Sequence, residues 1–141
     1  MRFFLNIDPP TATSQENKTA LVQGRLMHYK SARAKQTFST LTKALLPFVP
    51  KEPMDGPIRL ICEWRFPTGK SHSDNEWKIT RPDTDNLQKA LKDVMTRLGF
   101  WKDDSRVCSE LVTKKWSSMP GIWVMVEPIR SETEVIEHDE G

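Results

Sequence analysis

Carboxylate side chains gather in two short segments in the second half of the chain. They are Arg81-Pro82-Asp83-Thr84-Asp85-Asn86-Leu87-Gln88-Lys89 and Phe100-Trp101-Lys102-Asp103-Asp104. Pro82 favours extended geometry at the residue before it. If the chain stays extended from Asp83 to Asp85, the two side chains point the same way. Paired carboxylates suit a hard cation such as Mg²⁺ or Mn²⁺, so the pair indicates a metal site. The residues leave open an alternative, in which Asp85 only caps a helix.

The elements around these carboxylates can be read from apolar spacing. Apolar residues at helical spacing from Leu87 to Leu98 predict an amphipathic helix that begins near Asn86, with Gly99 as its C-terminal cap. Alternation from Ile58 to Phe66 predicts a strand before it, and residues 67 to 80 read as a long polar loop.

Other segments complete the expected fold. We expect a first strand over Phe3 to Ile7, a helix from Ala34 to Leu45 with Ser31 as its N-cap, and no regular element between residues 11 and 29. Two last strands, near 106–116 and 122–127, are predicted to form a hairpin through Met119-Pro120-Gly121. The sum is an α+β fold, a small single domain with a mixed sheet of about four strands and two main helices.

Charge is distributed unevenly along the 141 residues, although the formal net charge is only +2. The last fifteen residues carry six acidic residues and one basic residue, which leaves a net charge of +7 on residues 1–126. A basic body suits a polyanion as partner. We therefore expect one domain over residues 1–127 and an acidic, disordered tail over 128–141.

Several classes of protein are excluded by composition. No apolar run is long enough to span a membrane, and the N-terminus reaches Asn6 and Asp8 too early for a secretory signal. Cys62 and Cys108 cannot form a disulfide scaffold or a zinc site by themselves. Both are expected to be buried thiols on strands, in a protein of the reducing cytoplasm.

The two acidic segments together resemble the RusA-type Holliday junction resolvases. That family has a DxDNLxK block, a helix and a GFxxDD block, and residues 83–104 match this pattern without a gap. Asp8-Pro9-Pro10 is similar to the proline pair after the family's first strand, and the Arg-Pro before Asp83 resembles phage and Gram-positive variants. The segment 11–29 and the tail do not align.

The resemblance implies a Mg²⁺-dependent endodeoxyribonuclease that acts as a homodimer on four-way DNA junctions, in a bacterial or phage-infected cell, with no membrane partner and no organic cofactor. Carried over by position, the metal ligands are Asp83, Asp85 and Asp104. Lys89 is the motif lysine, expected near the scissile phosphate. Of the pair Asp103 and Asp104, Asp103 is the weaker candidate for a metal ligand. A non-catalytic junction-binding module and a broader branched-DNA or flap nuclease are the alternatives.

The position of Asp104 raises a question of distance. A helix from Asn86 to Leu98 is ~20 Å long, and the six residues that follow span at most about 20 Å. Our hypothesis is that the chain doubles back, so that Asp104 rejoins Asp83 within one subunit. The alternative is that the partner subunit donates Asp104.

DNA contacts are expected from basic residues and from one tryptophan. Trp77, in the polar loop, is the candidate to stack on an unpaired base, whereas Trp64, Trp116 and Trp123 are expected in the core and Trp101 at the helix exit. The basic candidates are Arg25, Lys30, Arg33, Lys35, Lys70, Lys78 and Arg81, together with Lys89.

Overall fold

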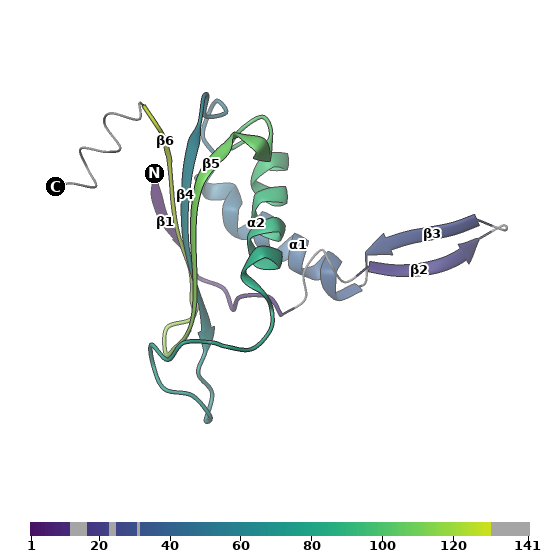
Figure 1. Cartoon of the computed structure of the whole chain (residues 1–141), viewed down its shortest axis with the longest axis vertical. Coiled ribbons are helices and arrows are strands. Elements are labelled where there is room, and N and C mark those ends of the chain that lie inside the picture. Colours follow the sequence, from purple (N-terminus) through teal and green to yellow (C-terminus); the bar gives the residue numbers. More distant parts are fainter. Residues whose placement is uncertain (12–16, 23–24, 31, 131–141) are drawn as a thin grey trace.

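One mixed sheet with two helices on one face forms the body of the protein (Figure 1). The computed structural model describes the backbone of residues 1–11, 17–22, 25–30 and 32–130, and the side chains of 1–11 and 32–130. The strand order is β1-β6-β4-β5, where the strands are β1 (Arg2–Leu5), β4 (Ile58–Pro67), β5 (Val107–Ser117) and β6 (Gly121–Pro128). The helices are α1 (Ala32–Leu45) and α2 (Thr84–Leu98). The expected small single α+β domain is confirmed.

Strand β4 is the centre of the sheet and fits the predicted alternation. Its residues alternate between buried and half-buried, because one face meets the helices. β6 pairs with it antiparallel on one side and β5 parallel on the other. The predicted hairpin between the last two strands is therefore wrong, since β4 lies between β5 and β6. A parallel pair needs a crossover, and α2 supplies it between β4 and β5.

The core lies between the sheet and the two helices. Leu41 and Leu45 of α1 and Leu87, Leu91 and Val94 of α2 are fully buried there. Gly99 ends α2 in the left-handed conformation, with φ 90°, and its N–H donates to the carbonyls of Met95 and Thr96. The predicted C-cap is thus confirmed.

A two-stranded ribbon projects from the body beside α1 (Figure 1). Strands β2 (Asn17–Val22) and β3 (Arg25–Lys30) pair antiparallel in a sheet of their own. The prediction of an irregular segment between residues 11 and 29 is therefore wrong, because these two strands pair with each other without the polar–apolar alternation that marks a strand on a core. Ser31, the predicted cap of α1, lies outside the described residues.

Two short 3-10 turns, the end of β1 and the two cysteines complete the description of the fold. Single 3-10 turns occupy Leu46–Phe48 and Asp104–Arg106, and β1 stops at Leu5 instead of Ile7. Cys62 is buried, and burial raises the pKa of its thiol to about 12. Cys108 is exposed, so its expected burial is wrong. Among the described residues, no helix is long and apolar enough to cross a membrane.

Candidate functional site

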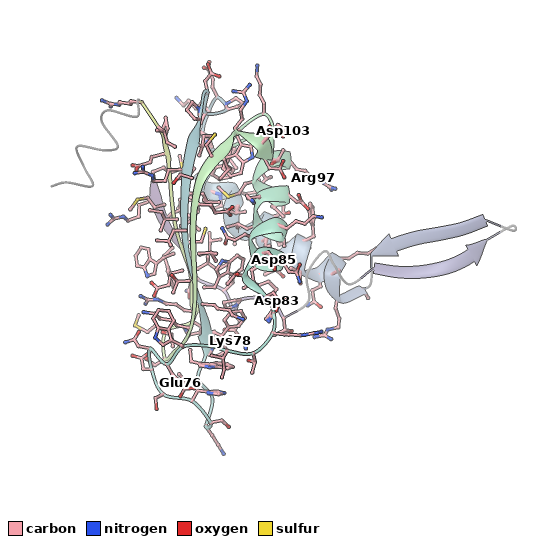
Figure 2. The ribbon with its side chains drawn as sticks, viewed as in Figure 1. Glu76, Lys78, Asp83, Asp85, Arg97 and Asp103 are labelled. Atoms are coloured by element: carbon pink, nitrogen blue, oxygen red, sulfur yellow. The ribbon has the colours of Figure 1, made fainter. Side chains whose placement is uncertain are left out.

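Asp83 and Asp85 lie at the start of α2, but the helix begins earlier than expected (Figure 2). Its first residue is Thr84, so Asp83 is in the N-cap position and Asp85 is in the first turn. The prediction of an extended run from Asp83 to Asp85 is therefore wrong. Helix formation itself brings both carboxylates to the positive end of the helix dipole.

The capping alternative can be judged from hydrogen bonds. Asp83 is extended at φ −73° and ψ 150°, as an N-cap residue is, yet its side chain makes no cap hydrogen bond. Asp85 accepts one hydrogen bond, from the N–H of Asn86 at 3.0 Å. Both residues are exposed, and no described cation forms an ion pair with either one. Their oxygens are therefore accessible to a hard cation, whose preferred ligands they are.

Lys114 holds the turn that leads into Asp83. Its ammonium donates to the carbonyl oxygens of Thr80 at 2.6 Å and of Pro82 at 2.7 Å. Lys114 lies on β5, so a distant strand fixes the backbone just before the acidic pair. No pattern in the sequence points to Lys114, because nothing local distinguishes it from any other lysine on a strand.

A second set of contacts, made by residues that were not predicted for the site, packs α2 against the sheet. Gln88 is 2% exposed, its Oε1 accepts from the indole Nε1 of Trp64 at 2.6 Å, and its Nε2 donates to Glu110 at 2.7 Å. Lys92 then donates to the other carboxylate oxygen of Glu110 at 3.0 Å. This relay of Trp64, Gln88, Glu110 and Lys92 ties the middle of α2 to β4 and β5.

Asp103 lies at the opposite end of α2 (Figure 2), and Asp104 follows it as the first residue of the 3-10 turn. Asp103 accepts the backbone N–H of Ser105 at 2.8 Å, and this bond is the main reason that its pKa is lowered. Asp104 is exposed and begins the 3-10 turn. The length of α2, 15 residues, separates it from Asp83 by about 22 Å along the helix axis.

The hypothesis that the chain doubles back to join Asp104 to Asp83 is therefore wrong. Phe100 and Trp101 follow Gly99 and are buried against the C-terminal end of α2, where the Trp101 indole donates to Thr96 at 2.7 Å. The chain returns only along β5, whose first residue is Val107. Among the described residues, no three acidic, histidine or cysteine side chains cluster as a metal site.

The basic residues that are expected to contact DNA lie in several parts of the structure. Lys89 is exposed on α2 one turn after Asp85, and Arg81 is exposed just before the acidic pair. Lys35 and Lys70 are exposed on α1 and in the 68–80 loop. Arg33 and Lys78 line one pocket. Arg25 and Lys30 lie on β3, and their side chains lie outside the described part of the structure.

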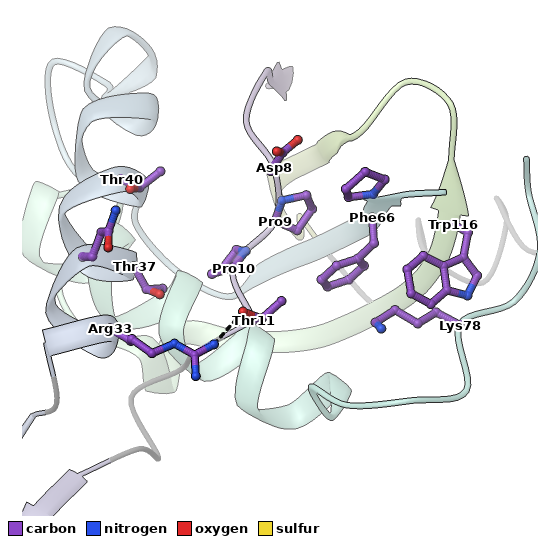
Figure 3. A pocket seen from close by; sticks show the side chains of 12 residues that line it. Asp8, Pro9, Pro10, Thr11, Arg33, Thr37, Thr40, Phe66, Lys78 and Trp116 are labelled. Atoms are coloured by element: carbon purple, nitrogen blue, oxygen red, sulfur yellow. Dashed lines mark hydrogen bonds between the residues drawn. The ribbon is translucent and has the colours of Figure 1, made fainter. Parts of the chain in front are cut away.

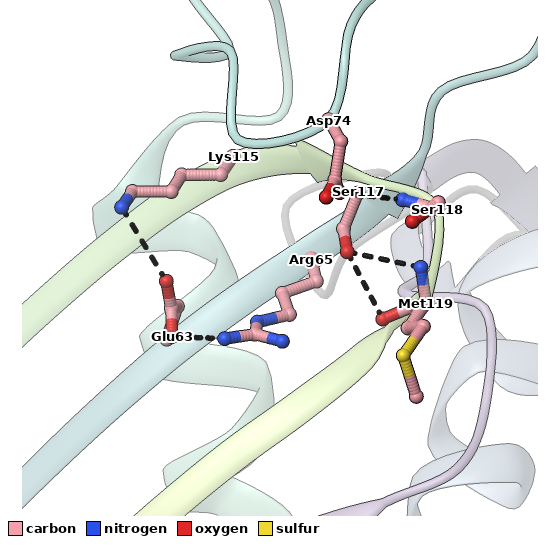
Figure 4. A network of polar contacts seen from close by, with 7 residues as sticks. All are labelled: Glu63, Arg65, Asp74, Lys115, Ser117, Ser118 and Met119. Atoms are coloured by element: carbon pink, nitrogen blue, oxygen red, sulfur yellow. Dashed lines mark hydrogen bonds and ion pairs between the residues drawn. The ribbon is translucent and has the colours of Figure 1, made fainter.

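The long polar loop is tied to the end of β5. Trp116 donates its N–H to the Glu76 carbonyl at 2.8 Å and accepts from the Asn75 N–H at 2.8 Å. The Asp74 carboxylate accepts from the Ser118 N–H at 2.8 Å, which lowers its pKa (Figure 4). These bonds fix the loop that carries Lys70, Trp77 and Lys78.

The tryptophans are only partly where they were expected. Trp64 and Trp101 are fully buried, and Trp116 packs half-buried against the core, as predicted. Trp123 is 39% exposed on the sheet face away from the helices, so its predicted core position is wrong. Trp77 is 63% exposed and has the Lys115 ammonium 4.7 Å from its ring centroid.

Comparison with known proteins agrees with the arrangement of motif and elements. The family model of endodeoxyribonuclease RusA matches residues 8–127. A crossover junction endodeoxyribonuclease of Lactococcus phage r1t is 32% identical over 107 residues, which are 74% of this chain and 80% of that protein. The uncharacterized protein YqaN of Bacillus subtilis (strain 168) is 31% identical over 91 residues, 57% of this chain and 63% of that protein. With a family match that spans most of its length, the chain belongs to the RusA family of endodeoxyribonucleases.

Proposed function

We propose that the protein is a crossover junction endodeoxyribonuclease, which resolves four-way DNA junctions by paired, symmetric phosphodiester hydrolysis. Family membership and the phage relative support this activity. The observation that carries it is the exposed pair Asp83 and Asp85, whose oxygens lie at the start of α2 with Lys89 one turn further on. These side chains suit the metal-dependent cleavage of a polyanion. The proposed location is the cytoplasm of a bacterial or phage-infected cell.

The metal that we propose is Mg²⁺, with Mn²⁺ as a possible substitute, held by Asp83, Asp85 and Asp104. A divalent ion supplies charge neutralisation at the phosphate and an activated water. We prefer Asp104 to Asp103 as the third ligand, because Asp103 caps the 3-10 turn through its hydrogen bond from the Ser105 N–H. Lys89 follows Asp85 by four residues on α2, a spacing that puts both on one helix face. We assign to it the stabilisation of the charge that develops on the phosphate.

The position of Asp104 supports the proposal of a homodimer. Because Asp104 and Asp83 lie at opposite ends of α2, a two-fold axis across the helix would place Asp104 of one subunit beside the acidic pair of the other. Strand β5 supports such an axis, since it is an edge of the sheet. The 75–78 segment bonds only to Lys114 and Trp116 on that side, and no described segment pairs with Val107–Thr113 there. Such an edge is open to antiparallel pairing with a second copy.

Binding requires contacts to the DNA backbone, for which basic side chains are suited. We assign this part to Arg25, Lys30, Arg33, Lys35, Lys70, Lys78 and Arg81, with Trp77 as the residue that stacks on a base. The domain is proposed to span residues 1–127, with 128–141 as an acidic tail outside it.

The test is cleavage of labelled four-way, flap and duplex DNA with Mg²⁺ or with EDTA. We expect paired symmetric nicks in the four-way DNA, only with the metal. Asp83→Asn and Asp85→Asn should lower the cleavage rate on the order of 10³-fold, because each removes a proposed metal ligand. Both should leave junction binding intact, because they remove only negative charge and keep the basic contacts to DNA. Asp93→Asn, a half-buried carboxylate on the same helix, is the matched control and should cut normally.

Each other result selects an alternative. Binding without cleavage in Mg²⁺ and in Mn²⁺ would make the protein a junction-binding module. Cleavage of flaps and junctions at similar rates would make it a broader branched-DNA nuclease. Loss of binding in Asp83→Asn would contradict the separation between metal ligands and DNA contacts.

Lys114 provides a further prediction, as a positioning residue. Lys114→Met removes the ammonium that holds the Thr80 and Pro82 carbonyls. A shift of about 1 Å in the turn before Asp83 should slow cleavage about 100-fold. The concentration of Mg²⁺ needed for half-maximal rate should rise as well, because Asp83 is a ligand.

The control is Lys43→Met, which removes an exposed lysine of α1 that has no contact with the turn before Asp83 among the described residues. We expect it to cut at close to the wild-type rate. An unchanged metal requirement in Lys114→Met, together with a lower melting temperature, would reduce Lys114 to a purely structural residue.

A further inference from the structure

A pocket of about 460 Å³ opens between the loop after β1, helix α1 and the end of β4 (Figure 3). Pro9, Pro10 and Phe66 form an apolar wall, and Arg33 and Lys78 bring positive charge to it. Lys78 is five residues before Asp83 in the sequence, and its ammonium donates to Thr80, whose carbonyl also accepts from Lys114. The pocket therefore adjoins the turn that leads into the proposed metal site.

Lys78 is unusual for a lysine because only 7% of it is exposed. Its ammonium donates to the Thr80 hydroxyl at 2.8 Å and lies 4.0 Å from the ring centroid of Trp116. No carboxylate of the described residues pairs with it. Burial, and then the charge of Lys114, lower its pKa. A buried cation without an anion is costly, which is the situation that a bound phosphate would relieve.

A second cation faces Lys78 across the pocket. Figure 3 shows the Arg33 guanidinium and the Lys78 ammonium pointing toward each other, while the Asp8 carboxylate at the rim points away from both. Arg33 is positioned by a hydrogen bond to the Thr11 hydroxyl at 3.1 Å. Two cations on opposite walls can bind a single backbone that passes between them.

The apolar wall identifies the rest of the ligand. Both faces of the Trp116 ring are already occupied, one by Lys78 and the other by His72, which stacks at 3.8 Å between centroids. A nucleobase would therefore pack on Pro9, Pro10 and the edge of Phe66. The cavity volume suits one nucleotide and is far too small for a duplex.

We propose that this pocket binds one unpaired nucleotide of the DNA strand that is cut, with its phosphate between Arg33 and Lys78 and its base on the proline wall. The inference rests on the proposed function and adds to it a subsite that requires local unpairing beside the cleaved bond. Enzymes that take a base out of the stack bind it in a fitted pocket of this kind.

Two variants test the pocket, each with a matched control. Thr40 lines the pocket from the exposed side of α1, so Thr40→Phe should obstruct it, whereas Ser39→Phe places the same ring next to Lys35 and Arg97. Lys78→Met keeps the stem of the side chain without its charge, and Lys43→Met removes an exposed charge on α1.

The first readout is 2-aminopurine fluorescence in a four-way junction, with the probe at each position beside the cut and EDTA present. We expect a several-fold rise at one position with the wild type and both controls, and none with Thr40→Phe or Lys78→Met. These two variants should also cut about tenfold more slowly in Mg²⁺. A wild type that cuts junctions but unstacks no probe, or pocket variants that behave as their controls do, would overturn the proposal.

The second readout needs neither a junction nor cleavage. A fluorescein-labelled thymidine tetranucleotide should bind the wild type, with affinity at least about fivefold weaker for Thr40→Phe and Lys78→Met than for the controls. If the wild type cuts no junction yet shows this pattern, the proposed function fails and the pocket stands. Equal affinities for all five proteins would overturn the pocket.

Discussion

Co-expressed Asp83→Asn and Asp104→Asn subunits should cut four-way DNA, although each variant alone is inactive. In the proposed dimer, each site takes Asp83 and Asp85 from one subunit and Asp104 from its partner. One site of the mixed dimer then carries both substitutions, and the other site carries none. Random mixing gives roughly half mixed dimers, so about a quarter of the wild-type number of sites should be active.

The measurement is the rate of nicking of a four-way junction that is labelled on each strand. Mixed dimers should nick one strand at a time, whereas the wild type makes paired cuts. The reciprocal mixture is the control. Wild type mixed with the Asp83→Asn, Asp104→Asn double variant should form inactive mixed dimers, since each of their sites lacks one carboxylate. If the first mixture is inactive and the second is active in its mixed dimers, the site lies within one subunit and the sharing of Asp104 is wrong.

Gln88→Leu should destabilise the fold more than any change to the exposed carboxylates. The variant removes the acceptor of the Trp64 indole N–H, which is fully buried, and the amide that Glu110 binds. A buried donor without an acceptor costs about 1–3 kcal/mol, and Glu110 loses a second partner. We expect a loss of about 3 kcal/mol in the free energy of unfolding, or roughly 10 °C in melting temperature.

Thermal and urea unfolding measure this loss, with Lys92→Met as the control from the other end of the same relay. The Lys92 pair with Glu110 is partly exposed, so its loss should cost less than about 1 kcal/mol. A Gln88→Leu protein that melts within ~2 °C of the wild type would show that the relay does not hold α2 against the sheet. A milder loss in Lys92→Met than in Gln88→Leu supports the relay as described.

Local periodicity predicted the elements that carry the site. The alternation over Ile58–Phe66 and the helical spacing from Leu87 to Gly99 both match β4 and α2, because each element buries one face against a single core. The start of α2 was predicted two residues late, since Pro82 and the acidic spacing favoured an extended run. Asp83 is nevertheless extended, and only Asp85 has joined the helix.

Long-range pairing could not be read from the same patterns. The final strands are linked by a short turn at Met119-Pro120-Gly121, a signal that favours a hairpin, yet both strands pair with β4 instead. The strand pattern around Trp123 predicts a core position, but its place in β6 turns it to the open face. There its ring packs on that of Phe4, with 4.9 Å between the ring centroids. Lys114 acts through contacts to the turn before Asp83, and Gln88 acts through its contact with Trp64 of β4. Both sets of contacts arise only in the folded chain.

The length of α2 has a consequence for the geometry of the products. In the proposed dimer, two antiparallel copies of this helix lie between the active centres, so their separation is set by 15 residues, about 22 Å. That span equals six to seven nucleotides of stacked strand at ~3.4 Å each. In that dimer the helix would act as a fixed spacer, and one inserted turn would move the two incisions apart by about 5.4 Å without altering either centre.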